Sequence, residues 1–175
     1  MQIYNHDNYH ITDILKDAYP AIRREYMLRN KFCSKPEYRG TASGPGQVLS
    51  GTWNTLNVVS RNKTSVWRQW FFPNTCKLIK QIPVYENMRF SILGPGTELV
   101  THTGWGDHFA LAHLGIDCNE DSCLVVGDQE VREKNGEVII FNDHCPHWAY
   151  NRGDTERIVL IFDILKTDLN KSLKK

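Results

Sequence analysis

The sequence predicts a mainly β fold: a double-stranded β-helix, or jelly-roll barrel, with N-terminal helices packed on one face. Three observations favour this class. From residue 88 onward, short apolar runs alternate with turns rich in Gly, Asn and Asp, as in antiparallel sandwiches and barrels. Residues 11–32 follow a helical period instead. The length of 175 residues suits a single domain, expected over residues 1–175, with a sizeable core.

Residues 1–87 are expected to form a helical and looped N-terminal part. Within residues 11–32, apolar side chains recur along one face, from Ile11 to Met27. Pro20 is expected to end a first helix and to open a second one, because proline lacks the backbone N–H that a helix interior uses. The segments expected after it are a loop over residues 39–51, a strand over 52–60, and a helix from Pro73 to about Gln81 within the mixed segment 65–82.

Residues 88–164 are expected to form the jelly-roll core. Asn135-Gly136 is a strong signal for a hairpin within it. The charged residues 165–175 are expected to fray. The predicted strands of the core are 88–93, 98–103, 107–116, 122–127, 129–134, 137–142, 147–151 and 156–164.

The composition argues against several classes of partner. The net charge is +1 and no long basic face is apparent, so we expect neither nucleic-acid nor membrane binding. The first twenty residues do not resemble a signal peptide, and no stretch is apolar enough to span a bilayer. The five cysteines are odd in number and form no CxxC pair, which favours buried thiols in a reducing compartment. A cytoplasmic location is therefore expected.

Histidines concentrate in the strand-rich half of the chain, where five of the seven lie between residues 102 and 147. His102 ends one predicted strand and His147 begins another. Side chains at the strand ends of a barrel converge on one cavity, and imidazole is the commonest side-chain metal ligand at neutral pH. A structural role on a strand is the alternative for each. The pattern makes His102 and His147 candidate metal ligands.

Arg157 opens the last predicted strand, whose other residues are mostly apolar. An arginine beside a buried run needs an anionic partner, and its planar fork suits a carboxylate. Two interpretations stay open. Arg157 forms a surface ion pair with Asp154 or Glu156, or it anchors the carboxylate of a ligand.

Several segments together resemble the aspartyl/asparaginyl β-hydroxylase family. The resemblance covers most of residues 52–164, with an upstream helix at 73–83, and several separate motifs occur in the family's order. It implies an iron(II)- and 2-oxoglutarate-dependent oxygenase that hydroxylates an unactivated carbon, with succinate and CO2 as coproducts. The matching segments are PNTCKLIKQIP (73–83), FSILGPGT (90–97), THTG (101–104), AHLGI (112–116), EKNGEVIIFNDHCPHWAYN (133–151) and ERIVLIFDI (156–164).

The resemblance assigns the metal to two histidines, matched by His102 and His147. Most related oxygenases add a carboxylate two residues after the first histidine. That position is not acidic in this family, and here it is Gly104. A water, or less favourably Asp107, could fill the vacant place. No catalytic residue beyond the metal ligands is implied.

The resemblance also assigns the cosubstrate site. A serine and an arginine of the family hold the distal carboxylate of 2-oxoglutarate, and they match Ser91 and Arg157. A family histidine that contacts the cosubstrate matches His113. His108 and His144 are not expected to bind the metal, although His108 could substitute for a missing donor to the cosubstrate.

Two departures from the family concern the substrate. Phe109 and Leu111 stand where the family motif carries two arginines, so the pocket is expected to be less cationic and an Asp or Asn side chain becomes a doubtful substrate. The expected partners are 2-oxoglutarate, O2 and an amino-acid, peptide or related small-molecule substrate.

Two other classes stay open. One is a cupin-type metalloenzyme that does not use 2-oxoglutarate, since one fold hosts many functions. The other is a catalytically degenerate binding module, which the missing arginine at Leu111 favours. Ser91 and Arg157 discriminate against the cupin-type enzyme, because it needs no clamp for a distal carboxylate. The retained pair His102 and His147 argues against a degenerate module.

Overall fold

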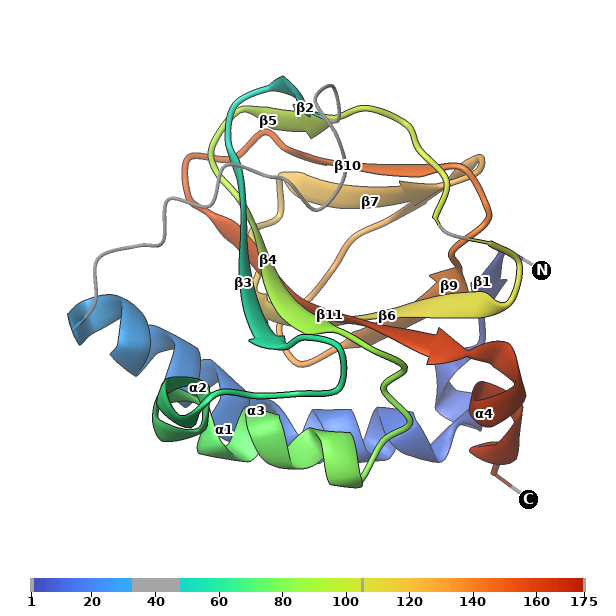
Figure 1. Cartoon of the computed structure of the whole chain (residues 1–175). Coiled ribbons are helices and arrows are strands. Elements are labelled where there is room, and N and C mark those ends of the chain that lie inside the picture. The colour runs from blue at the N-terminus through green and yellow to red at the C-terminus, as the bar shows by residue number, and fades with distance from the viewer. Residues whose placement is uncertain (1, 33–47, 105, 175) are drawn as a thin grey trace.

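The computed structural model describes residues 2–32, 48–104 and 106–174, and its architecture is two facing antiparallel sheets with helices on one side (Figure 1). The strands of the larger sheet are β1 (Ile3–Tyr4), β3 (Trp53–Val59), β4 (Met88–Leu93), β6 (Phe109–Asp117), β9 (Val138–Asn142) and β11 (Arg157–Leu165). Those of the smaller sheet are β2 (Val48–Ser50), β5 (Thr97–Leu99), β7 (Ser122–Val126), β8 (Gln129–Val131) and β10 (His147–Asn151). The helices are α1 (His10–Phe32), α2 (Val66–Phe71), α3 (Pro73–Lys77) and α4 (Lys166–Lys171), with 3-10 turns at His6–Asn8 and Leu78–Lys80.

The order of the larger sheet is β1-β9-β6-β11-β4-β3, and that of the smaller sheet is β2-β5-β10-β7-β8. Consecutive strands repeatedly alternate between the two sheets, which is the connectivity of a jelly roll. The predicted fold class is therefore confirmed. Strands β1, β2 and β3 precede residue 88, so the sheets extend beyond the 88–164 segment that the sequence indicated.

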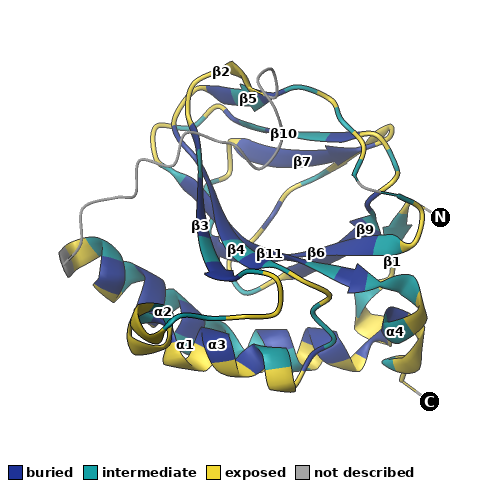
Figure 2. Cartoon of the chain, in the orientation of Figure 1, coloured by how far each residue is buried: buried dark blue, intermediate teal, exposed yellow. Residues whose placement is uncertain are grey.

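Alternation along β11 separates the two sides of the larger sheet. Ile158, Leu160, Phe162 and Ile164 point to the helices and join the core that also contains apolar residues of α1 and α3. Arg157, Ile161 and Asp163, on the other face, line the space between the sheets. The helices thus cover the outer face of the larger sheet, as predicted, and buried positions fill both layers (Figures 1 and 2). The inner face carries polar side chains beside apolar ones, which form a second core cluster between the sheets.

Helix α1 is continuous through Pro20, so the prediction of two helices was wrong. Proline inside a helix costs roughly 3 kcal/mol. Leu15 and Ile22, on either side of Pro20, are fully buried against the sheet, and burying one such side chain contributes about 1.5–3 kcal/mol. Because Pro20 itself is exposed, its ring meets solvent rather than the core. Packing of one long apolar face outweighs the missing hydrogen bond.

Asn135-Gly136 forms a turn, as Gly136 with φ of 79° shows, but it does not connect paired strands. It joins β8 of the smaller sheet to β9 of the larger one, so the hairpin prediction was wrong. The hairpin lies one turn earlier, where β7 pairs with β8 around Gly127. Residues 48–50 of the predicted loop form β2, and residues 39–47 lie outside the described residues.

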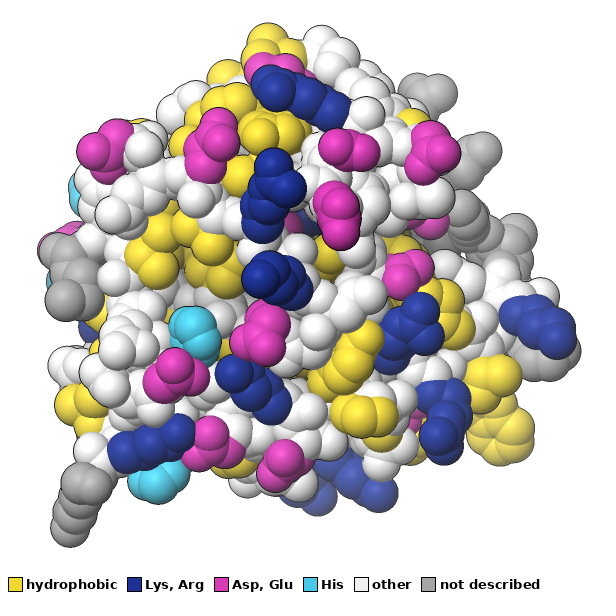
Figure 3. Space-filling view, turned by 180° about the vertical axis from the view of Figure 1, so that it is seen from behind, with side chains coloured by type: hydrophobic (Ala, Val, Ile, Leu, Met, Phe, Trp, Pro, Cys, Tyr) yellow, Lys and Arg dark blue, Asp and Glu magenta, His cyan; other side chains and the backbone are white. Residues whose placement is uncertain are grey.

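Residues 166–174 are ordered, in contrast to the fraying expected. Leu169 of α4 is fully buried, and the backbone N–H of Lys174 donates to Asn8 O at 2.8 Å. The burial of Leu169 and this hydrogen bond to the N-terminal segment hold the charged tail against the rest of the protein. Among the residues described, no helix is both long and apolar enough to cross a membrane. On the face opposite to that of Figure 1, acidic and basic side chains are intermixed (Figure 3).

Candidate metal centre

His102 and His147 lie side by side, one before β6 and one at the start of β10. Each donates its backbone N–H to the carbonyl of the other, at 3.0 Å from His102 and 2.8 Å from His147. Their ring centroids are 4.4 Å apart. The structure therefore brings together the two histidines that the sequence singled out.

Local hydrogen bonds fix the orientation of both rings. Nδ1 of His102 lies 2.8 Å from Val100 O, and Nδ1 of His147 lies 2.9 Å from Cys145 O. Because a carbonyl only accepts, each Nδ1 carries a proton, so a neutral ring at either position presents its lone pair at Nε2. Burial lowers the pKa of His147 to about 4, so this ring is neutral near pH 7. An imidazole whose Nδ1 is anchored in this way presents Nε2, the atom through which it can bind a metal.

At the position of the usual third ligand, the Asp143 carboxylate occupies the space that a side chain would need. A Cβ on Gly104 would lie 1.7 Å from Oδ2 of Asp143, a buried residue that lines the same cavity. Asp107 is exposed and pairs with Lys166 at 2.5 Å, a hydrogen bond that lowers the pKa of Asp107. Among the described residues, no group of three or more His, Cys, Asp or Glu side chains could hold a metal. Within the described part of the chain, His102 and His147 are therefore the candidate ligands.

The two imidazoles face a cavity of about 630 Å³ between the sheets. This volume is in the range of small-molecule sites. Every site residue predicted from the sequence lines it, together with Trp53: Ser91, His102, His113, His147 and Arg157. His108 and His144 are exposed, and neither lines the cavity.

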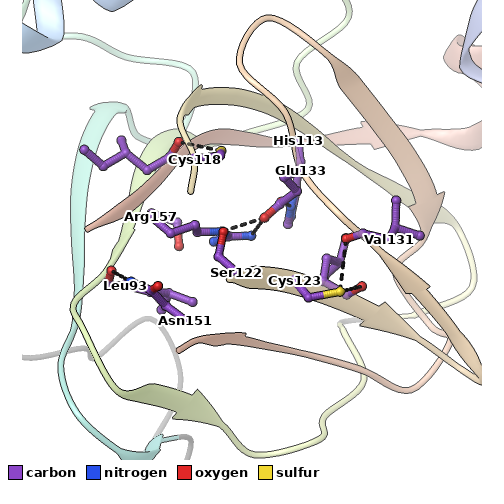
Figure 4. Close-up of polar contacts among 12 residues, drawn as sticks. Leu93, His113, Cys118, Ser122, Cys123, Val131, Glu133, Asn151 and Arg157 are labelled. Atoms are coloured by element: carbon purple, nitrogen blue, oxygen red, sulfur yellow. Dashed lines mark hydrogen bonds and ion pairs between the residues drawn. The ribbon is translucent and has the colours of Figure 1, made fainter. Parts of the chain in front are cut away.

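Arg157 is 1% exposed and pairs with Glu133, which is 4% exposed (Figure 4). Nε of Arg157 donates to Oε2 of Glu133 at 2.5 Å, and Nη2 lies close to the same oxygen. Nη2 makes no hydrogen bond of suitable geometry among the described residues. Neither Asp154 nor Glu156 is the partner of this buried cation, so the surface ion pair considered from the sequence was wrong.

Glu133 also contacts His113, whose Nδ1 lies 2.7 Å from Oε1. Sequence reasoning missed Glu133, because a charged residue between β8 and β9 has the pattern of an exposed turn. It missed Trp53 as well. Trp53 donates its Nε1–H to Oγ of Ser91 at 2.9 Å and lines the cavity. Its position at the start of a predicted strand carried no sign of this bond.

These features define the class of the protein: a jelly roll with two neighbouring imidazoles at a cavity of mixed polarity between its sheets. Residues 16–167 match the family model described as Aspartyl/Asparaginyl beta-hydroxylase. The chain therefore belongs to the aspartyl/asparaginyl β-hydroxylase family, a family of hydroxylases.

Similar proteins include an ornithine lipid ester-linked acyl 2-hydroxylase of Rhizobium tropici, 30% identical over 161 residues, which cover 88% of this chain and 56% of that protein. The mouse aspartate beta-hydroxylase domain-containing protein 2 is 28% identical over 167 residues, or 89% of this chain and 48% of that protein. The chain spans about half the length of these relatives. A solved cupin-like protein of Thermotoga maritima has a TM-score of 0.45 and 12% identity over 78% of this chain and 84% of that chain.

Proposed function

We propose that this protein is an iron(II)- and 2-oxoglutarate-dependent oxygenase that hydroxylates an unactivated carbon. One observation carries the proposal: two anchored imidazoles line the same cavity as a buried guanidinium, whose five N–H donors exceed what Glu133 alone can accept. A cupin-type metalloenzyme without 2-oxoglutarate would explain the imidazoles alone.

The donor set fits iron(II). His102 and His147 would hold the metal through Nε2, since both Nδ1 atoms bind backbone carbonyls. Two protein ligands leave the remaining positions for the cosubstrate, O2 and water. Asp143, whose carboxylate occupies the space beside Gly104 and lines the same cavity, would add negative charge near the metal.

The cavity also fits the distal carboxylate of 2-oxoglutarate. Nε and Nη2 of Arg157 both face Oε2 of Glu133, which leaves other N–H groups of the guanidinium for a second carboxylate. Because Oγ of Ser91 accepts from Trp53, the Ser91 hydroxyl keeps its proton for another acceptor. Arg157 and Ser91 would thus both donate to that carboxylate.

The protein residues would bind, orient and exclude water. Iron(II) and 2-oxoglutarate, when bound, would supply the oxidising chemistry, with succinate and CO2 as coproducts. His102 and His147 would fix the reacting end of the cosubstrate, and Arg157 would fix its far end. The apolar side chains of Leu99 and Leu124 in the cavity wall would limit access of water to the site. No acid or base of the protein is needed.

The substrate would carry an amino-acid unit. Similar proteins are named for hydroxylating aspartyl or asparaginyl residues or the acyl group of an ornithine lipid. Phe109 and Leu111 both line the cavity, so the wall has apolar groups where the family motif has arginines. Arg89 and Asp163 also line it, which gives mixed charge rather than a purely cationic pocket. A cytoplasmic location remains a prediction.

The test is formation of succinate from 2-oxoglutarate by purified protein supplied with iron(II) and O2. His102→Ala and His147→Ala should abolish both iron binding and succinate formation. His144→Ala, in an exposed histidine of the loop that precedes β10, is the matched control and should keep both iron binding and succinate formation. Iron binding that survives in His102→Ala and His147→Ala would refute the proposed centre.

A further inference from the structure

Glu133, His113 and Arg157 form a buried cluster beside the cavity, contributed by the segment between β8 and β9, by β6 and by β11. Their exposed fractions are 4%, 6% and 1%. Oε1 of Glu133 faces Nδ1 of His113 at 2.7 Å, and Oε2 accepts from Nε of Arg157 at 2.5 Å (Figure 4). Each carboxylate oxygen thus has its own partner on a different strand.

The charges within the cluster balance. Burial lowers the pKa of His113, although Glu133 opposes this effect, so the imidazole is neutral. The carboxylate of Glu133 and the guanidinium of Arg157 then cancel. A guanidinium without such a partner would be an uncompensated buried charge, which is strongly unfavourable.

The geometry divides the donors of Arg157 between two acceptors. A guanidinium carries five N–H donors, and Glu133 faces the edge formed by Nε and Nη2. The remaining N–H donors are left for a second acceptor in the cavity that the Arg157 side chain lines. His113 is arranged in a similar way: its Nδ1 faces Glu133, and its ring lines the cavity.

We propose that Glu133 is a positioning residue that holds Arg157 and His113 in the orientation that receives the distal carboxylate of the cosubstrate. It contacts neither metal ligand nor cosubstrate itself. The inference rests on the proposed function, because it assigns a role toward the 2-oxoglutarate that the cavity would bind. It makes Glu133 a determinant of preference for 2-oxo acids with a second carboxylate.

The experiment compares 2-oxoglutarate with 2-oxovalerate, which has a methyl group in place of the distal carboxylate. Binding of each is measured by calorimetry on the manganese(II)-loaded protein, so no turnover is needed. Glu133→Asp keeps the charge but withdraws the oxygens by about one methylene, so it cannot reach both partners. Glu133→Gln keeps the reach and can accept from Nε of Arg157. Glu130→Gln, in an exposed residue of β8, is the matched control.

Glu133→Asp should reduce the preference for 2-oxoglutarate by roughly tenfold or more, equivalent to about 1.4 kcal/mol, with binding of 2-oxovalerate nearly unchanged. Glu133→Gln should reduce this preference by a smaller factor, and Glu130→Gln should leave it unchanged. Equal weakening of both ligands would show a merely structural role and overturn the inference, as would an unchanged preference in Glu133→Asp. A wild-type protein that does not prefer 2-oxoglutarate would instead refute the proposed function.

A measurement on the wild-type protein covers the case in which neither variant folds. The Nε–H of Arg157, observed by ¹⁵N NMR, should exchange slowly with solvent before any ligand is added, because Glu133 accepts from it. Addition of 2-oxoglutarate should shift the Nη signals and leave Nε–H protected. Rapid exchange of Nε–H in the free protein would overturn the inference.

Discussion

Arg157 donates to Glu133 and, in the proposed function, also to the carboxylate of the ligand. A substitution of Arg157 that tests ligand binding must therefore keep its ion pair with Glu133. Arg157→Ala would leave the buried carboxylate of Glu133 without its cation, which would lower the stability of the fold by about 3–5 kcal/mol. A loss of ligand binding could then not be separated from a loss of folded protein. Arg157→Lys keeps a positive charge for Glu133 but lacks the planar fork. The conservative change is therefore the informative one.

We expect Arg157→Lys to weaken 2-oxoglutarate binding by about tenfold or more, because an ammonium cannot direct donors to both carboxylates at once. Iron affinity should stay the same, since the substitution does not touch His102 or His147. The measurement is succinate formation against 2-oxoglutarate concentration at saturating iron. An unchanged concentration dependence would remove Arg157 from the cosubstrate site.

The ionisation of Glu133 should make the free energy of unfolding depend on pH. Burial alone raises its pKa, but Arg157 and His113 outweigh burial, and the pKa is lowered. A lowered carboxyl pKa contributes stability that is complete above the unfolded value, about 4.3, and is lost as pH falls through the folded value. Protonated Glu133 then resembles glutamine.

Glu133→Gln should therefore be less stable than the wild type at pH 7, and this difference should shrink as pH falls below about 4. Urea unfolding of both proteins at pH 7 and at pH 3.5 measures it. A difference that is the same at both pH values would mean that Glu133 is not ionised in the folded protein.

The partner of Arg157 shows what spacing along a chain can reveal. An arginine in an apolar strand required an anion, and this requirement was visible in the sequence. Glu133 lies 24 residues away, on the connection between the two sheets, so only the fold brings it to Arg157. His102 and His147 were easier to find, because each stands near a predicted strand end and within a segment that resembles the family.

Among the elements, strand positions were predicted well because period-two alternation and turn residues are local. The exceptions depended on packing. Pro20 lies within α1 because a long apolar face docks on the sheet, and Asn135-Gly136 turns the chain between sheets rather than within one. Which sheet receives the next strand is decided by long-range burial and cannot be read from the turn.

Helix α4 provides a prediction at this scale. Leu169 is fully buried, so Leu169→Ala should lower the free energy of unfolding by about 2–5 kcal/mol. Leu173, 44% exposed in the same tail, is the control, and Leu173→Ala should cost less than about 0.5 kcal/mol. Denaturant unfolding of the two variants compares them. Equal effects would mean that α4 does not dock through Leu169.

At the scale of the whole molecule, the jelly roll places two kinds of group on opposite walls of one cavity. The smaller sheet provides His147, which pairs with His102. The larger sheet provides Arg157, Ser91 and His113. A ligand that chelates a metal at one end and carries a carboxylate at the other would bridge the walls. The helices add no group to this cavity and support the larger sheet from behind.

The proposed function requires that 2-oxoglutarate binds iron(II) held by His102 and His147. Anaerobic titration of the iron(II)-loaded protein with 2-oxoglutarate, followed by visible absorption, measures this binding. We expect a metal-to-ligand charge-transfer band that saturates at one equivalent in the wild type and in His144→Ala and is absent in His102→Ala. A wild-type protein that binds iron(II) but develops no such band with 2-oxoglutarate would contradict the account.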